Sequence, residues 1–195
     1  MLDTVLQIAG GSFYLLAKVG FFFSELPRLK LKKDRLMLLA WLSYCLGLPF
    51  IIVLFAVSRN WIAVFLEAAA GPAMILGVIN SWKSQSRSYE WIDWFVRLMI
   101  PLGVALSFVD NHGIRTINQV LEIAMVIGFL AGTWFLARRH NTGYLWFLLM
   151  NGSCALLMYR QHRTVMVVQQ IISALFVLGA YIGSRSGQTK QPNLS

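Results

Sequence analysis

The sequence predicts an all-α membrane protein, a polytopic bundle of about seven spanning helices. Of its 195 residues 57% are hydrophobic and only 13% are charged, and the mean hydropathy is +0.63. Soluble domains carry about 25% charged residues, so a soluble globular protein is not expected. The apolar runs approach the roughly 20 residues that a helix needs to cross a hydrocarbon core about 30 Å thick. They lack the alternation of a β-barrel, which leaves a helical bundle.

Seven apolar runs follow one another, at about 4–23, 36–57, 61–82, 91–109, 117–137, 144–159 and 164–183. The first contains Lys18, which we expect to extend its ammonium to the nearer membrane surface, and the sixth is short. Residues 1–183 therefore form one predicted integral membrane domain. The tail 184–195, SRSGQTKQPNLS, is polar and is predicted to be disordered.

The basic residues predict the orientation, because loops rich in Lys and Arg remain in the cytoplasm. With seven spans and an external N-terminus, eleven basic residues fall on the inner side and four on the outer side. We therefore expect a cytoplasmic C-terminus in a plasma membrane, the bacterial inner membrane. The inner set is Arg28, Lys30, Lys32, Lys33, Arg35, Lys83, Arg87, Arg138, Arg139, Arg185 and Lys190; the outer set is Arg59, Arg115, Arg160 and Arg163.

Several function classes are excluded. The net charge of +9 lies almost wholly in loops, so nucleic acid is not an expected partner. Cys45 and Cys154 fall inside apolar runs and are expected to pack rather than pair, while His112, His140 and His162 lack metal-ligand spacing. There is no H-E-x-x-H, G-x-S-x-G or G-x-x-x-x-G-K-[ST] motif. The sequence therefore predicts neither an enzyme nor a bound metal or cofactor.

Prolines and carboxylates inside the runs are candidates for gating or structural roles. Pro49, Pro72 and Pro101 each remove a helical hydrogen bond, which either provides a hinge or shapes a static bundle. Glu67 and Glu122 lie a few residues inside their spans, where a carboxylate must be neutral, paired or in a wet cavity. We favour a structural or gating role for them over proton coupling.

A faint internal repeat relates the third and fifth runs at an offset of 55 residues. Because spans two positions apart run in the same direction, it would be a parallel repeat. Leu66, Glu67, Ala69, Gly77, Tyr89 and Trp91 recur as Leu121, Glu122, Ala124, Gly132, Tyr144 and Trp146.

The start of the sixth run predicts a binding site. Tyr144, Phe147 and Asn151 are spaced i, i+3, i+7, which places two rings and an amide on one helix face. Rings that stack and an amide that hydrogen-bonds suit a flat heteroaromatic ligand. The short loop 138–143 makes the fifth run an antiparallel neighbour of the sixth. Polar groups in the last run are expected to face the same interior. The predicted substrate-binding residues are Asn151, Phe147, Tyr144, Thr133, Trp134, Trp146 and Gln169.

The C-terminal third of the chain resembles the PnuC family of vitamin and nicotinamide riboside transporters, relatives in fold of the SWEET sugar facilitators. The resemblance comprises Trp134-Phe-Leu-Ala-Arg138-Arg139, Tyr144-x-x-Phe147-x-x-x-Asn151, Tyr159 and the closing Gly-Ala-Tyr-Ile-Gly183. Family members commonly carry tryptophan where this chain has Tyr144 and Phe147. The resemblance implies two three-helix units joined by a linking helix, a 3+1+3 arrangement. The YgjV-type bacterial inner-membrane proteins show a weaker similarity.

Two classes of function follow. The leading hypothesis is a facilitative transporter for a small, neutral-to-zwitterionic metabolite, nucleoside-like or vitamin-like. The alternative is a non-transporting accessory or structural protein of the inner membrane, which the scarcity of polar residues in the first three spans favours. A transporter should bring its polar groups together near mid-membrane, whereas a structural protein should scatter them against backbone carbonyls. The expected partners are the lipid bilayer and a small-molecule substrate; whether the chain forms a homo-oligomer is left open.

Overall fold

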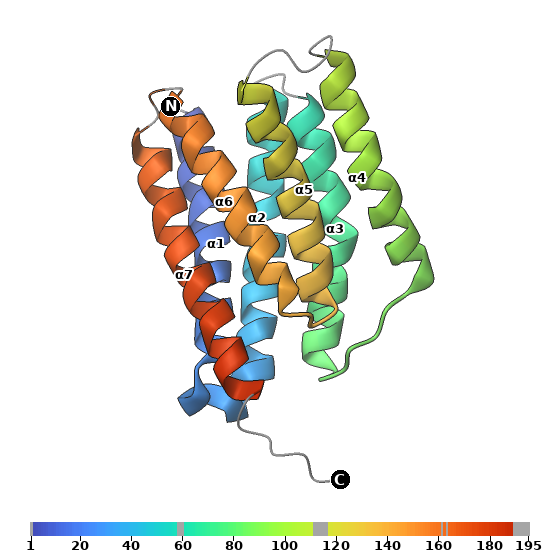
Figure 1. Cartoon of the computed structure of the whole chain (residues 1–195), viewed down its shortest axis with the longest axis vertical. Helices are drawn as coiled ribbons and strands as arrows, with labels where there is room; N and C mark the ends of the chain where they lie inside the picture. Colours follow the sequence, from blue (N-terminus) through green and yellow to red (C-terminus); the bar gives the residue numbers. More distant parts are fainter. Residues whose placement is uncertain (1, 58–60, 111–116, 161, 163, 189–195) are drawn as a thin grey trace.

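The computed structural model describes residues 2–57, 61–110, 117–160, 162 and 164–188, and within them the chain is all-helical (Figure 1). Five of the helices, α1, α2, α3, α5 and α7, are long and apolar enough to cross a membrane. The helices are α1 (Leu2–Glu25), α2 (Lys33–Val57), α3 (Trp61–Trp82), α4 (Glu90–Asp110), α5 (Ile117–Ala137), α6 (Thr142–Arg160) and α7 (Thr164–Gln188), with a 3₁₀ helix, η1 (Pro27–Lys32), between α1 and α2.

The predicted helix positions are confirmed, and α3 and α5 have the expected bounds. The one clear difference is at the C-terminus, where α7 continues five residues past the predicted end of the membrane domain at 183. Ser184 is buried there and donates a hydrogen bond to the Tyr181 carbonyl, so residues 184–188 are helix rather than disordered tail. Predictions on Arg59, His112, Arg115, Arg163, Lys190 and the segment 189–195 lie outside the described residues.

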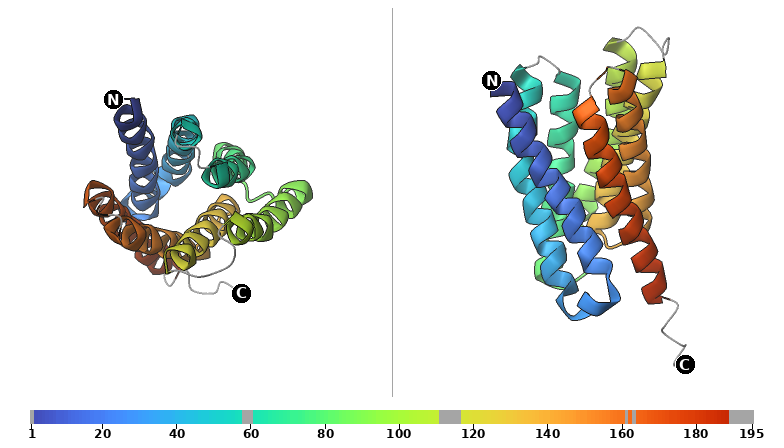
Figure 2. Two further views of the ribbon diagram at one scale, coloured as in Figure 1. Left: turned by 90° about the horizontal axis from the view of Figure 1, so that it is seen from above. Right: turned by 90° about the vertical axis from the view of Figure 1, so that its left-hand side faces the viewer.

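Six helices surround a common interior. α1 packs on α2 and α7, α2 on α3, α3 on α5, α5 on α6, and α6 on α7, while α4 packs on the outside against α3 and α5. Figure 2, left, shows this order from above, with α4 at the margin of the bundle. The ends of α1, α3, α5 and α7 and the starts of α2, α4 and α6 share one end of the molecule, the lower end in Figure 1. We call it the basic end, because η1 and the 83–89 and 138–141 loops lie there.

Close approach between α5 and α6 depends on two glycines. A Cβ on Gly128 would lie 2.8 Å from both the Met150 nitrogen and the Trp146 carbonyl oxygen, and a Cβ on Gly132 would lie 2.7 Å from the Phe147 ring. Small residues four apart let membrane helices bring their backbones together, which increases van der Waals contact where the hydrophobic effect is absent. This contact places the inner face of α6 deep in the bundle.

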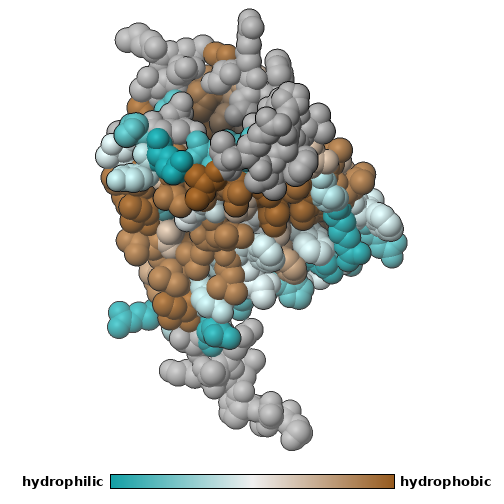
Figure 3. All heavy atoms as spheres, turned by 45° about the horizontal axis from the view of Figure 1, so that its top comes forward, coloured by the Kyte–Doolittle hydropathy of each residue, from teal (hydrophilic) through white to brown (hydrophobic). Residues whose placement is uncertain are grey.

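The outward faces of the helices are apolar. Ile8, Leu39, Leu98 and Leu175 each expose more than half of their side chain. Figure 3 shows hydrophobic residues dominating one face, with hydrophilic residues toward its margins. Soluble monomers rarely expose contiguous apolar patches above a few hundred Å². The exposed apolar faces, together with the five long apolar helices, indicate integration into a membrane.

Candidate functional site

Asn151 is the centre of a buried polar contact between three helices. It lies on α6, is 0% exposed, and accepts two hydrogen bonds at its Oδ1 atom. Lys18 of α1 donates one over 2.7 Å, and Ser173 of α7 donates the other over 3.1 Å. Lys18 is only 4% exposed, so the expectation that it extends to the membrane surface was wrong. It lies seven residues before the end of α1, roughly 10 Å from the basic end at 1.5 Å per residue.

A second contact adds α3 to the same region. Tyr14, one helical turn before Lys18 on α1, donates a hydrogen bond to Glu67 Oε2 over 2.6 Å. Lys18 lies close enough to Glu67 for the two to interact electrostatically. A buried cation and carboxylate compensate each other's charge, and removing one leaves the other costly to bury. We call Tyr14, Lys18, Glu67, Asn151 and Ser173 the interior cluster.

Two hydrogen-bond donors beside the cluster lack partners within the described residues. They are the Asn151 Nδ2 atom and the Tyr44 hydroxyl, both fully buried. An unmade hydrogen bond on a buried group costs about 1–3 kcal/mol. Such groups are therefore expected to meet a ligand, a water molecule or a moving side chain in the working protein.

Aromatic rings enclose the cluster on its α2 and α6 side. The Tyr44 and Phe147 rings stack with centroids 6.1 Å apart, and the Tyr14 ring meets Tyr44 edge-on at 4.8 Å. Phe147 is 0% exposed and packs against Gly132. The predicted face of Phe147 and Asn151 therefore points into the bundle, and its neighbours are α1, α2, α5 and α7.

Tyr144 also faces the interior, but it is bound elsewhere. Its hydroxyl donates to Glu25 Oε1 over 3.1 Å, and Lys33 pairs with the other Glu25 oxygen at 2.7 Å. This contact joins α6, α1 and α2 at the basic end, one helical turn from Phe147. The sequence placed Tyr144 at the entrance to a site; the structure shows it as a buried connection between helices.

Thr133 and Trp134 do not join the interior cluster. The Thr133 hydroxyl donates to the Phe129 carbonyl of its own helix over 2.7 Å. The Trp134 indole donates a hydrogen bond to Asp93 over 2.8 Å, which connects α5 to α4. The Arg138 guanidinium lies over the same indole ring. Trp134 is directed to α4 rather than toward Asn151, and the Thr133 hydroxyl is bonded within its own helix, because neighbouring depth along antiparallel helices does not fix the direction of a side chain.

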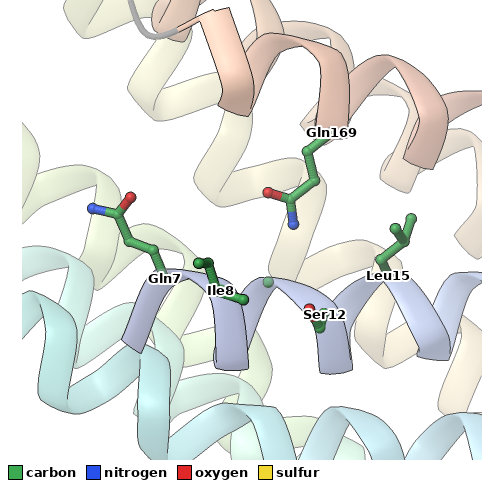
Figure 4. Close-up of a pocket in the computed structure, with 6 residues that line it drawn as sticks. Gln7, Ile8, Ser12, Leu15 and Gln169 are labelled. Atoms are coloured by element: carbon green, nitrogen blue, oxygen red, sulfur yellow. The ribbon is translucent and has the colours of Figure 1, made fainter. Parts of the chain in front are cut away.

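Gln169 and Trp146 lie apart from the cluster as well. Gln169 lines an open groove of about 170 Å³ between α1 and α7, where its amide reaches toward α1 between Gln7 and Ser12 (Figure 4). Gly11 permits this approach, since a Cβ there would lie 2.5 Å from the Gln169 Nε2 atom. Trp146 is half-buried on α6, and its backbone meets Gly128.

The residues predicted for gating occupy mixed positions. Glu67 belongs to the interior cluster, and Glu122 is half-buried near the start of α5. Pro49, Pro72 and Pro101 lie inside α2, α3 and α4, where Pro49 and Pro101 are exposed on the outer face and Pro72 is half-buried.

Sequence reasoning missed Lys18, Tyr14, Tyr44 and Ser173. One signal was present: a lysine within an apolar run is costly in hydrocarbon and requires a polar partner unless it reaches the surface. Tyr14, four positions earlier on the same helix face, would have extended that search. Ser173 and Tyr44 carried no comparable signal.

The fold and the cluster define a class, a helical membrane bundle with a charged, hydrogen-bonded interior. Comparison with known protein families, curated proteins and solved structures found no match to this chain.

Proposed function

We propose that the protein is a facilitative transporter for a small metabolite, with its substrate site at the interior cluster. The observation that carries the proposal is the meeting of Lys18, Asn151 and Ser173, from three helices, beside a buried donor on Asn151 that has no partner among the described residues. A purely structural contact would satisfy each buried group, since that is the lower-energy arrangement. A binding site keeps donors for its ligand.

Helix direction supports seven crossings, including α4 and α6, which are less apolar. Asn80 near the end of α3 donates a hydrogen bond to the carbonyl of Ala137 at the end of α5, so both helices end at the same level. If α3 and α5 both cross in that direction, α4 must return between them. The same reasoning applies to α6 between α5 and α7.

The order of packing supports the 3+1+3 arrangement. The inner helices form a ring in the order α1, α2, α3, α5, α6, α7. If α1 is equivalent to α5, α2 to α6 and α3 to α7, every pair of neighbours in the ring corresponds to another pair of neighbours. Under that equivalence α4 is the linking helix outside the ring. The internal repeat at an offset of 55 residues pairs α3 with α5 instead, and the order of helices in the ring does not favour that pairing.

The proposed orientation places the basic end in the cytoplasm of a bacterial cell and the N-terminus outside. Its support is the concentration of Lys and Arg at that end. Trp82, Trp91 and Trp94 are exposed near the same end, as in the aromatic belt of a membrane–water interface. Pro49, Pro72, Pro101 and Glu122 are proposed to serve the shape or gating of the bundle.

The resemblance to PnuC-type transporters is proposed to reflect a substrate site on the sixth helix. Its motif residues Phe147 and Asn151 face the interior, where a ligand would lie between halves of the bundle. Tyr144 lies with them but is held by Glu25. The proposed substrate class is therefore a small vitamin-like, nucleoside-like or otherwise zwitterionic metabolite.

The test is uptake by purified protein in proteoliposomes, with radiolabelled metabolites supplied as pools and then singly. Asn151→Ala removes the central amide and should abolish any saturable uptake, because it leaves Lys18 and the ligand without their shared partner. Ser184→Ala is the matched control: it also removes a buried polar group, but one that bonds its own helix. Equal uptake by Asn151→Ala and wild type would place the site elsewhere.

One observation favours the alternative, a structural or accessory membrane protein. The hydroxyls of Thr133, Ser24 and Ser184 each bond a carbonyl of their own helix, which is the scattered pattern expected of a static bundle. Absence of uptake for every pool, with a folded and monodisperse protein, would favour that function.

A further inference from the structure

The hydrogen-bonding groups around Asn151 are unequally divided between donors and acceptors. Its amide oxygen already accepts from Lys18 and Ser173, and its Nδ2 donor has no partner within the described residues. The Tyr44 hydroxyl is a second unpartnered donor, and a lysine ammonium has three N–H groups, of which one goes to Asn151. This side of the cluster therefore suits a ligand group that only accepts, and its positive charge favours an anionic one.

The opposite side of the cluster is acidic. Glu67 receives the Tyr14 hydroxyl at one oxygen and retains further acceptor capacity. The Tyr14 ring lies beside it and meets the Tyr44 ring edge-on. A positively charged ligand group would find its partners here.

The two sides are about one helical turn apart along α1. Lys18 and Tyr14 are four residues apart on α1, so their side chains leave the same face about 6 Å from each other. A ligand with both charges can replace the direct attraction between Lys18 and Glu67 without leaving either uncompensated. A singly charged ligand would leave one buried charge without a partner, at a cost of several kcal/mol.

We propose that the substrate is a small zwitterion of the α-amino-acid type, whose carboxylate binds Lys18, the Asn151 Nδ2 group and Tyr44, and whose ammonium binds Glu67 beside Tyr14. This inference rests on the proposed transport function and narrows its substrate class. It assigns recognition to Lys18 and Glu67, on α1 and α3, in addition to the face of α6.

The first experiment measures the binding of matched ligands to the purified wild-type protein by thermal shift and equilibrium dialysis. The L-α-amino acids are tested singly, and each one that binds is compared with its methyl ester, which lacks the carboxylate, and its N-acetyl derivative, which lacks the ammonium. Uridine and adenosine are tested in the same assays as uncharged ligands for comparison. We expect at least one amino acid to bind and both of its derivatives to bind at least ten-fold more weakly.

The second experiment assigns the two charges. Lys18→Met should weaken the amino acid at least ten-fold and remove the preference for it over the methyl ester. Glu67→Gln should also weaken the amino acid at least ten-fold and should remove the preference for it over the N-acetyl derivative. Lys18 is the proposed partner of the carboxylate, which the methyl ester lacks, and Glu67 is the proposed partner of the ammonium, which the N-acetyl derivative lacks. Lys32→Met and Glu90→Gln, both at exposed positions, are the charge-matched controls and should bind as wild type. The double variant Lys18→Met/Glu67→Gln removes both charges if a single variant does not fold, and should lose amino-acid binding.

The outcomes separate this inference from the transport proposal. Binding of a nucleoside that requires Asn151, without binding of any amino acid, would keep the transporter and overturn the zwitterion. Amino-acid binding that Lys18→Met and Glu67→Gln leave unchanged would overturn the assignment of the charges. Absence of binding and uptake for every compound would overturn both proposals.

Discussion

The Lys18 ammonium lies 2.7 Å from the amide oxygen of Asn151, 133 positions further along the chain. Through this hydrogen bond the first helix meets the sixth in the buried interior of the bundle. Ser173 donates to the same oxygen and brings in the seventh helix. The contact therefore joins the two ends of the chain and couples the stability of the bundle to its candidate site.

Lys18→Met should destabilise the folded protein by about 3 kcal/mol, because Glu67 would be left as an uncompensated buried charge. Adding Glu67→Gln should restore most of the loss, since both charges are then absent. Unfolding of the detergent-solubilised variants by thermal or SDS titration measures the cycle. Losses that simply add would show that the two side chains do not interact.

Tyr144→Phe should lower the free energy of unfolding by about 1–2 kcal/mol, because it removes a buried hydrogen bond to Glu25 and leaves that carboxylate with one partner fewer. Tyr159→Phe is the control, since Tyr159 lies on the same helix and is 69% exposed. The two variants lose the same hydroxyl group. If their unfolding curves coincide, the Tyr144–Glu25 contact contributes nothing to the fold.

Gly128→Ala should destabilise the protein by about 1–3 kcal/mol, the usual effect of adding a methyl group to a packed interface. The new Cβ would lie 2.8 Å from two backbone atoms of α6, and backbone cannot rotate away as a side chain can. Gly152→Ala is matched, because it is also a helical glycine and nothing lies within 4 Å of its Cβ position. We expect Gly152→Ala to be neutral or stabilising in the same assay.

The proposed orientation predicts that Leu31→Cys is protected from impermeant maleimides in intact cells and labelled in inverted vesicles. Leu31 is fully exposed within η1, so labelling there reports the side of the membrane, whereas Ser24 nearby is buried and would not react on either side. Cys45 and Cys154 are replaced by alanine in the background. Labelling of intact cells would reverse the proposed topology.

The positions of the helices were predictable because their causes are local. A run such as 117–137 is apolar enough to leave water, and a helix is the way for one segment to satisfy its own backbone in an apolar medium. The ends of the helices follow from equally local signals, such as Pro27 after α1 and the polar loop between α5 and α6. The burial of Phe147 and Asn151 on one face of α6 also followed from their spacing.

The partners of these side chains were decided only by the tertiary structure. Lys18 was expected at the membrane surface because a long side chain near a helix end can reach it; in the bundle its nearest polar partner is Asn151. Trp134 has the expected depth but its indole bonds Asp93 of α4, while the Thr133 hydroxyl bonds the Phe129 carbonyl of its own helix. Spacing along one helix fixes which residues share a face. Which face meets which depends on how six helices pack around each other, and that arrangement arises from contacts between residues distant in the sequence, such as Tyr14 with Glu67 and Lys18 with Asn151.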